Sequence, residues 1–164
     1  MFLKPSKFPA QALALISLGS LAAVGAALIA QHQFGIRPCA WCVMQRGVFL
    51  LIAAVAGLAW MFRGQRLLRS IGLLLVMALS LAGVAAAGFQ HEVANKLASC
   101  DLTLADRIVT ALDLETLWPS VFMVTATCAD AAKYQLLGLG YEIWSGLLYI
   151  ATAVLAFLAL KTRR

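Results

Sequence analysis

The sequence predicts an all-α membrane protein, a bundle of four transmembrane helices with a short and a long outer loop. Of its 164 residues, 63% are hydrophobic and 12% are charged, and the mean hydropathy is +0.90. Soluble domains carry about a quarter charged residues. Cations frame four apolar runs, and the acids gather in one segment. We expect residues 1–164 to form a single transmembrane domain, because four spans leave little chain for a second one.

The four apolar runs have about the length that a helix needs to cross the bilayer, about 20 residues. The predicted spans are 11–31, 43–62, 70–89 and 143–160. The second and fourth are near the short end, so the flanking Arg46, Arg63 and Lys161 are expected to extend toward the interface. Lys4 and Lys7 precede the first run, but its length favours a retained span over a signal peptide, and no A-x-A precedes a plausible mature start.

The charge distribution predicts the orientation. The amino-terminal tail, the link between the second and third spans, and the carboxyl-terminal tail carry cations and no acid. The seven acids all follow the third span: Glu92, Asp101, Asp106, Asp113, Glu115, Asp130 and Glu142. The positive-inside rule therefore places both termini in the cytoplasm, with the loops 32–42 and 90–142 outside.

The four cysteines lie in the two outer loops, in the compartment where disulfides persist. Cys39 and Cys42 form a C-x-x-C pair in the first loop, and Cys100 and Cys128 lie in the second. One interpretation is that structural disulfides brace the loops. A C-x-x-C disulfide closes a very small ring and gains little chain entropy, which favours a redox role for that pair.

The segment after the C-x-x-C pair contains a candidate activating cation. Cys42 falls in the predicted first turn of the second span, where the helix dipole stabilises a thiolate. Arg46 follows at i+4 on the same helical face. It favours the thiolate and polarises an oxygen of a bound acceptor, or it anchors the helix at the interface; spacing alone leaves both open. His91, at a similar depth on the third span, is a candidate donor to a carbonyl or an ordinary interfacial histidine.

Metal and nucleic-acid binding are disfavoured. A zinc ribbon needs a second close cysteine pair, whereas Cys100 and Cys128 are 28 positions apart. Val43 stands where a c-type haem motif requires histidine. The cations form no basic stripe with interleaved aromatics, so no nucleic-acid partner is expected.

The long outer loop carries an amphipathic segment. One predicted helical stripe contains Leu114, Leu117, Trp118, Val121 and Phe122. Pro119 is expected to kink or restart this helix. The segment either lies in the membrane interface, holding Cys128 near the bilayer surface, or packs on the bundle, and the two are compatible.

Four stretches together resemble the bacterial DsbB family of disulfide-bond formation proteins. They are RPCAWCVMQR, FQHEVANKLASCD, LWPSVFMVTATCAD and LLGLGYEIWSGLL. The resemblance implies a quinone reductase of the bacterial inner membrane that reoxidises a periplasmic, thioredoxin-fold thiol oxidase of the DsbA type. The alternatives are a non-enzymatic bundle with structural loop disulfides and a reductase of the vitamin K epoxide reductase type, which the order of the cysteines fits less well.

The resemblance also implies roles for the candidate residues. Cys100 and Cys128 would form the disulfide that the reduced partner attacks, with Cys100 taking the mixed disulfide. Cys39 and Cys42 would pass the electrons on through a transient Cys39–Cys128 link, and Cys42 would face the quinone beside Arg46 and His91.

The acceptor implied is ubiquinone, or menaquinone under anaerobic conditions. A DsbA-type couple near −120 mV lies above a glutathione-like pool at about −180 to −210 mV, so a stronger oxidant than glutathione is needed.

Overall fold

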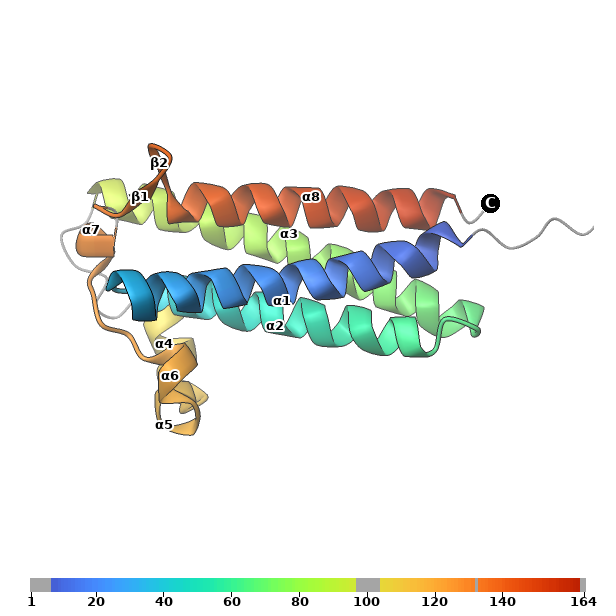
Figure 1. Ribbon diagram of the computed structural model, residues 1–164, viewed down its shortest axis with the longest axis horizontal. Coiled ribbons are helices and arrows are strands. Elements are labelled where there is room, and N and C mark those ends of the chain that lie inside the picture. The colour runs from blue at the N-terminus through green and yellow to red at the C-terminus, as the bar shows by residue number, and fades with distance from the viewer. Residues whose placement is uncertain (1–6, 97–103, 132, 163–164) are drawn as a thin grey trace, which may run out of the picture.

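Four long helices lie side by side in the computed structural model, which describes residues 7–96, 104–131 and 133–162, without the side chains of 93–96 and 128 (Figure 1). They are α1 (Phe8–Phe34), α2 (Ala40–Met61), α3 (Arg66–Lys96) and α8 (Tyr141–Lys161). Each contains a stretch long and apolar enough to cross a membrane. The predicted all-α bundle of four transmembrane helices is confirmed.

α1, α3 and α8 extend beyond the predicted apolar ranges at both ends, whereas α2 begins three residues earlier and ends one residue earlier than predicted. α1 ends at Phe34, where Gly35 takes the left-handed conformation (φ 65°) of a helix C-cap. α2 already begins at Ala40, so the short loop contains only residues 35–39 and is shorter than the predicted loop, residues 32–42. Cys42 therefore lies within the first turn of α2.

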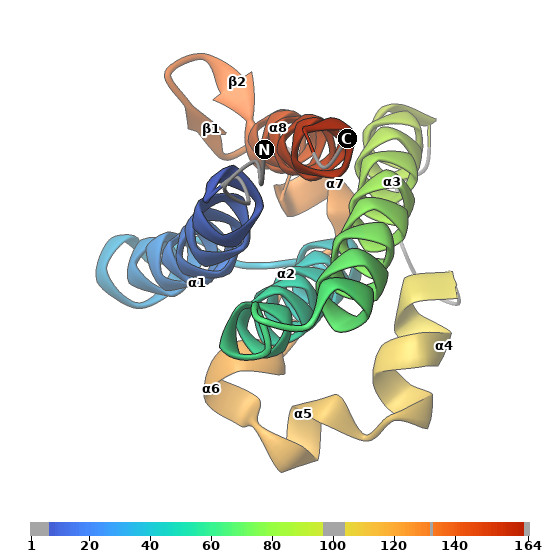
Figure 2. The same cartoon turned by 90° about the vertical axis from the view of Figure 1, so that its right-hand side faces the viewer.

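The long loop forms small elements at the end of the bundle where the short loop also lies, opposite the α2–α3 turn (Figure 1). These are α4 (Leu104–Ala111), α5 (Leu114–Leu117), α6 (Pro119–Phe122), α7 (Cys128–Ala131) and a hairpin of β1 (Gln135–Leu136) and β2 (Leu139–Gly140). Figure 2 shows α4, α5 and α6 projecting sideways beside α2 and α3, whereas the hairpin lies across the bundle next to α8. The loop thus reaches both sides of the bundle.

The predicted amphipathic stripe is divided between α5 and α6. The chain restarts its helix at Pro119, as expected of a residue that fits only the first turn. Leu117 and Trp118 are 73% and 59% exposed, whereas Val121 and Phe122 are buried. The apolar residues therefore do not share one buried face: α6 packs on the bundle, and the end of α5 is exposed.

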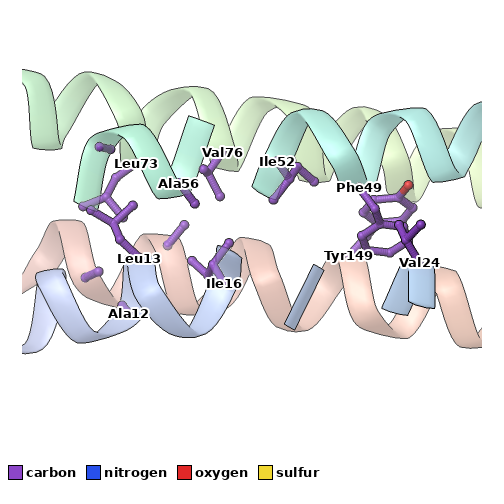
Figure 3. Close-up of a cluster of buried hydrophobic side chains, with 13 residues drawn as sticks. Ala12, Leu13, Ile16, Val24, Phe49, Ile52, Ala56, Leu73, Val76 and Tyr149 are labelled. Atoms are coloured by element: carbon purple, nitrogen blue, oxygen red, sulfur yellow. The ribbon is translucent and has the colours of Figure 1, made fainter. Parts of the chain in front are cut away.

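Close packing of α3 and α8 positions the half of the bundle next to the long loop. Figure 3 shows the Tyr149 ring stacked on Phe49, with centroids 4.1 Å apart. The other face of Tyr149 covers Gly83, where an added Cβ would collide with the ring. Small residues allow this approach in a bilayer, where helices associate largely through packing. The Tyr149 hydroxyl donates to the Gln45 carbonyl at 2.9 Å, which ties α8 to α2 one turn below Cys42.

Candidate redox and acceptor site

The C-x-x-C pair lies at the start of α2. Cys39 is the N-cap, with extended backbone (ψ 171°), and Cys42 is in the first turn. This turn brings the two Sγ atoms to 3.0 Å. Cys39 is fully buried, whereas Cys42 is partly exposed on the wall of a cavity. The two thiols are therefore chemically different: one is enclosed and the other is accessible.

Burial and hydrogen bonding assign the proton between the two sulfurs. The hydrogen bond to Cys42 and then burial raise the pKa of the Cys39 thiol. These effects favour the protonated Cys39 thiol, which donates to the Cys42 sulfur when Cys42 is ionised. The free N–H groups of the first turn of α2 also favour negative charge there. Cys42 is consequently the sulfur suited to be the thiolate and the nucleophile.

A pair of buried glutamines gives Cys42 a further donor. Gln90 Nε2 donates to Cys42 Sγ at 3.3 Å and to Cys39 Sγ at 3.7 Å. The side-chain oxygen Oε1 of Gln90 accepts a hydrogen bond from Gln45 Nε2 at 2.7 Å, which fixes the orientation of the Gln90 amide. Gln90 was not predicted from the sequence. The available signal was a polar residue next to His91 at the end of an apolar run, and the structure shows that Gln90 is buried whereas His91 is exposed. Gln90 thus stabilises negative charge on Cys42.

Gln90→Glu is expected to slow the reaction of Cys42 with iodoacetamide by about 10- to 100-fold, because a charge-assisted hydrogen bond worth about 1.5–3 kcal/mol is replaced by like-charge repulsion. The measurement is the alkylation rate at fixed pH in Cys100→Ser/Cys128→Ser protein, after reduction of the C-x-x-C pair. Gln33→Glu, which adds the same charge at an exposed position of α1, is the control. Equal rates in both variants would contradict the role given to Gln90.

A cavity of about 630 Å³ opens beside Cys42. Its walls come from α1, the short loop, α2, α3, α7, β1 and α8, and they are mainly apolar. Four alanines of α1 line the cavity, and their small side chains leave it open: Ala23, Ala26, Ala27 and Ala30. Cys42, Arg46 and Gln90 form a polar group on this wall. Pockets for drug-sized ligands have volumes of about 300–1,000 Å³ and this same pattern of apolar walls with few polar groups.

Arg46 is buried in the bundle and lines this cavity, so it does not extend to the interface as one prediction had it. Its Nη1 donates to Gln31 Oε1 at 2.6 Å and to the Val121 carbonyl at 2.9 Å. These contacts join α1, α2 and α6 around the guanidinium. Both use Nη1, and a guanidinium has five N–H donors, so others can bind an oxygen in the cavity. This location fits the alternative prediction, a fixed charge beside the thiolate.

His91 lies at the same end of the bundle but is not among the residues lining the cavity. Its side chain is 50% exposed, and Nδ1 lies 3.2 Å from Glu142 Oε1. Glu142 does line the cavity. His91 therefore reaches the cavity through Glu142, a residue that the sequence analysis counted only among the outer acids. The available signal was an acid directly before the predicted fourth span.

The second cysteine pair is described only in part. Cys100 lies outside the described residues, and only the backbone of Cys128, the first residue of α7, is described. Backbone N–H groups of Thr125 and Ala126 donate to the Pro38 carbonyl at 3.0 and 3.2 Å. These two bonds attach the segment before Cys128 to the residue before Cys39. The long loop thus brings the Cys128 backbone to the C-x-x-C end of the bundle.

The fold and the site define a class: a multi-pass membrane protein with a redox-capable dithiol at the edge of an apolar cavity. Residues 9–159 match the family described as Disulfide bond formation protein DsbB. Disulfide bond formation protein B 1 of Pseudomonas putida is 34% identical over 153 residues, which cover 93% of this chain and 90% of the relative. Disulfide bond formation protein B of Nitrosomonas europaea is 31% identical over 151 residues, covering 91% and 92%.

The chain belongs to the DsbB family. It is therefore a membrane oxidoreductase that acts on sulfur groups in disulfide bond formation.

Proposed function

We propose that this protein reoxidises a periplasmic thioredoxin-fold oxidase of the DsbA type and passes the electrons to ubiquinone in the bacterial inner membrane. The supporting observation is the position of Cys42, which lines a mainly apolar cavity while its partner Cys39 is enclosed. Cys39 is buried against the long loop, in a cluster that includes Ala105, Val124 and Ala131. The dithiol therefore has the acceptor cavity on one side and, on the other, the loop that carries the second cysteine pair. Menaquinone has the same apolar character and is the acceptor proposed for anaerobic growth.

The residues around the cavity fit a quinone. The volume suits a substituted ring with part of its tail, and the apolar walls suit the tail. Arg46 and Gln90 carry the N–H donors that a carbonyl oxygen needs. A bound quinone would supply an acceptor of two electrons and two protons. Cys42 would be the sulfur beside it, and Arg46 would stabilise negative charge on its oxygen.

The proposed electron path begins at the disulfide of Cys100 and Cys128. A reduced partner attacks Cys100 of this disulfide and releases the Cys128 thiolate. Cys128 then attacks Cys39 of a Cys39–Cys42 disulfide, which forms the Cys39–Cys128 bond and releases the Cys42 thiolate. The bonds from Thr125 and Ala126 to Pro38 support this transfer, because they keep the chain before Cys128 beside the C-x-x-C loop. The charge distribution supports an orientation with both termini cytoplasmic and all four cysteines periplasmic. The exposed Leu117 and Trp118 fit the bilayer interface on this side.

A quinone absorbance assay tests the proposal. The full-length protein in lipid nanodiscs is mixed with ubiquinone and a reduced thioredoxin-fold oxidase. We expect one quinone to be reduced for each partner dithiol that is oxidised. A non-enzymatic bundle with structural loop disulfides predicts no thiol–disulfide exchange with the partner. A reductase of the vitamin K epoxide reductase type predicts electron flow toward the partner's disulfide. Either result would overturn the proposed function.

A further inference from the structure

Glu142 is a buried acid on the wall of the acceptor cavity. It lies in the first turn of α8, and its side chain is 10% exposed. Its carboxylate folds back over Gly140, the N-cap of α8, where an added Cβ would overlap the carboxylate oxygens. Glycine at this position therefore gives the carboxylate the space to turn back. A negative charge is also favourable at the amino-terminal end of a helix. That interaction does not by itself explain why the Glu142 carboxylate is buried beside a cavity.

The partner of Glu142 connects it to the outside. His91 Nδ1 is 3.2 Å from Glu142 Oε1, within the reach of proton transfer. The His91 side chain is half exposed, and it belongs to α3, whereas Glu142 belongs to α8. One end of this pair therefore lies on the cavity wall and the other is in contact with solvent. Histidine titrates near neutral pH and commonly shuttles protons.

We infer that Glu142 and His91 form a proton relay between the outer solvent and the acceptor cavity. The inference rests on the proposed function. Oxidation of the Cys39 and Cys42 thiols breaks two S–H bonds, forms one S–S bond and releases two electrons and two protons, as many as a quinone takes up on reduction. Glu142 delivers one of the two protons from its carboxyl group, and His91 restores that proton from outer water, which receives the proton lost when Cys42 ionises. The second proton that the quinone takes up is the one that Cys39 loses as the S–S bond forms.

The other charged and titratable groups near the relay come from several elements. Among the described residues, those lining the same cavity are Arg37 of the short loop, Cys42 and Arg46 of α2, and Tyr141 of α8. Asp130 of α7, at the same end of the bundle, is paired with Lys133 at 2.7 Å. Glu142 is thus the one carboxyl group among the described residues that lines the cavity, which makes it the group suited to hold an exchangeable proton there.

Three variants separate proton transfer from a structural role. Glu142→Gln keeps the size and the hydrogen bond but holds no acidic proton, and we expect single-turnover quinone reduction to fall by about 100-fold. The dissociation constant for ubiquinone, measured by tryptophan quenching, should not change. Glu142→Asp keeps an acid on a shorter chain and should be faster than Glu142→Gln; a structural role predicts the reverse. His91→Ala should also be slow and should recover with added imidazole.

One measurement requires no quinone. The sequence has two histidines, His32 and His91, so ¹⁵N-histidine spectra of quinone-free protein show a separate signal set for each of them. Glu142→Gln should move the His91 Nδ1 resonance and leave His32, which contacts the Ser120 carbonyl, in place. Glu92→Gln, an exposed neighbour of His91, is the control and should leave both the His32 resonance and the turnover unchanged.

Two results would overturn the relay. One is an unmoved His91 resonance in Glu142→Gln, and the other is wild-type turnover in that variant. Failure of the wild type to reduce quinone would instead reject the proposed function, and the relay with it.

Discussion

Cys42→Ser is expected to abolish quinone reduction, with a loss of at least about 1,000-fold, because a serine hydroxyl is not a thiolate nucleophile and forms no disulfide. The structure supports this expectation, because Cys42 lies on the cavity wall, whereas Cys39 is buried and the pKa of its thiol is raised. The measurement is ubiquinone absorbance with a reduced thioredoxin-fold partner. Serine is nearly isosteric, so the fold is retained.

A second readout identifies the cause of that loss. Ubiquinone binding, followed by tryptophan quenching, should persist in Cys42→Ser, because Arg46 and the apolar walls are unchanged. The partner should still form a mixed disulfide at Cys100. If turnover is lost while ubiquinone binding and the mixed disulfide at Cys100 are both retained, the defect lies in electron transfer from Cys42. Normal turnover in this variant would refute the proposed electron path.

Arg46→Ala is expected to raise the apparent KM for quinone by about 10- to 100-fold, the equivalent of one charge-assisted hydrogen bond of about 1.5–3 kcal/mol. The guanidinium lines the cavity and is held by Gln31 and the Val121 carbonyl, so its remaining donors are preorganised. Arg46→Lys keeps the charge but not the planar set of donors, and an intermediate KM is expected. The measurement is steady-state quinone reduction at a fixed concentration of the partner.

The control for Arg46 is another arginine beside the same helix. Arg63 lies just beyond the other end of α2, over the Trp60 ring, and Arg63→Ala should leave the KM for quinone unchanged. Thiol exchange at Cys100 should proceed normally in Arg46→Ala, because the long loop does not require the cavity for that step. An unchanged KM in Arg46→Ala would remove this residue from the acceptor site.

Much of the fold could be predicted because it follows from local properties of the chain. Each spanning helix has its own apolar run with its own flanking cations, and Pro119 restarts a helix whatever surrounds it. The predicted position of Cys42 in a first turn also came from sequence spacing. By contrast, the division of the amphipathic stripe was not predicted: Val121 and Phe122 are buried because α6 packs against α2, a contact between segments far apart in the chain.

The sequence by itself determined the four spans, the C-x-x-C pair at the start of the second, and the grouping of acids and cysteines in the two loops that are predicted to lie outside. Only the tertiary structure decided that Cys39 is enclosed, that Gln90 donates to Cys42, and that His91 reaches the cavity through Glu142. The physical reason is that hydropathy and periodicity act along one helix. Which polar side chains meet depends on the rotation and register of α2, α3 and α8, and contacts such as Tyr149 on Gly83 set these only when the helices pack.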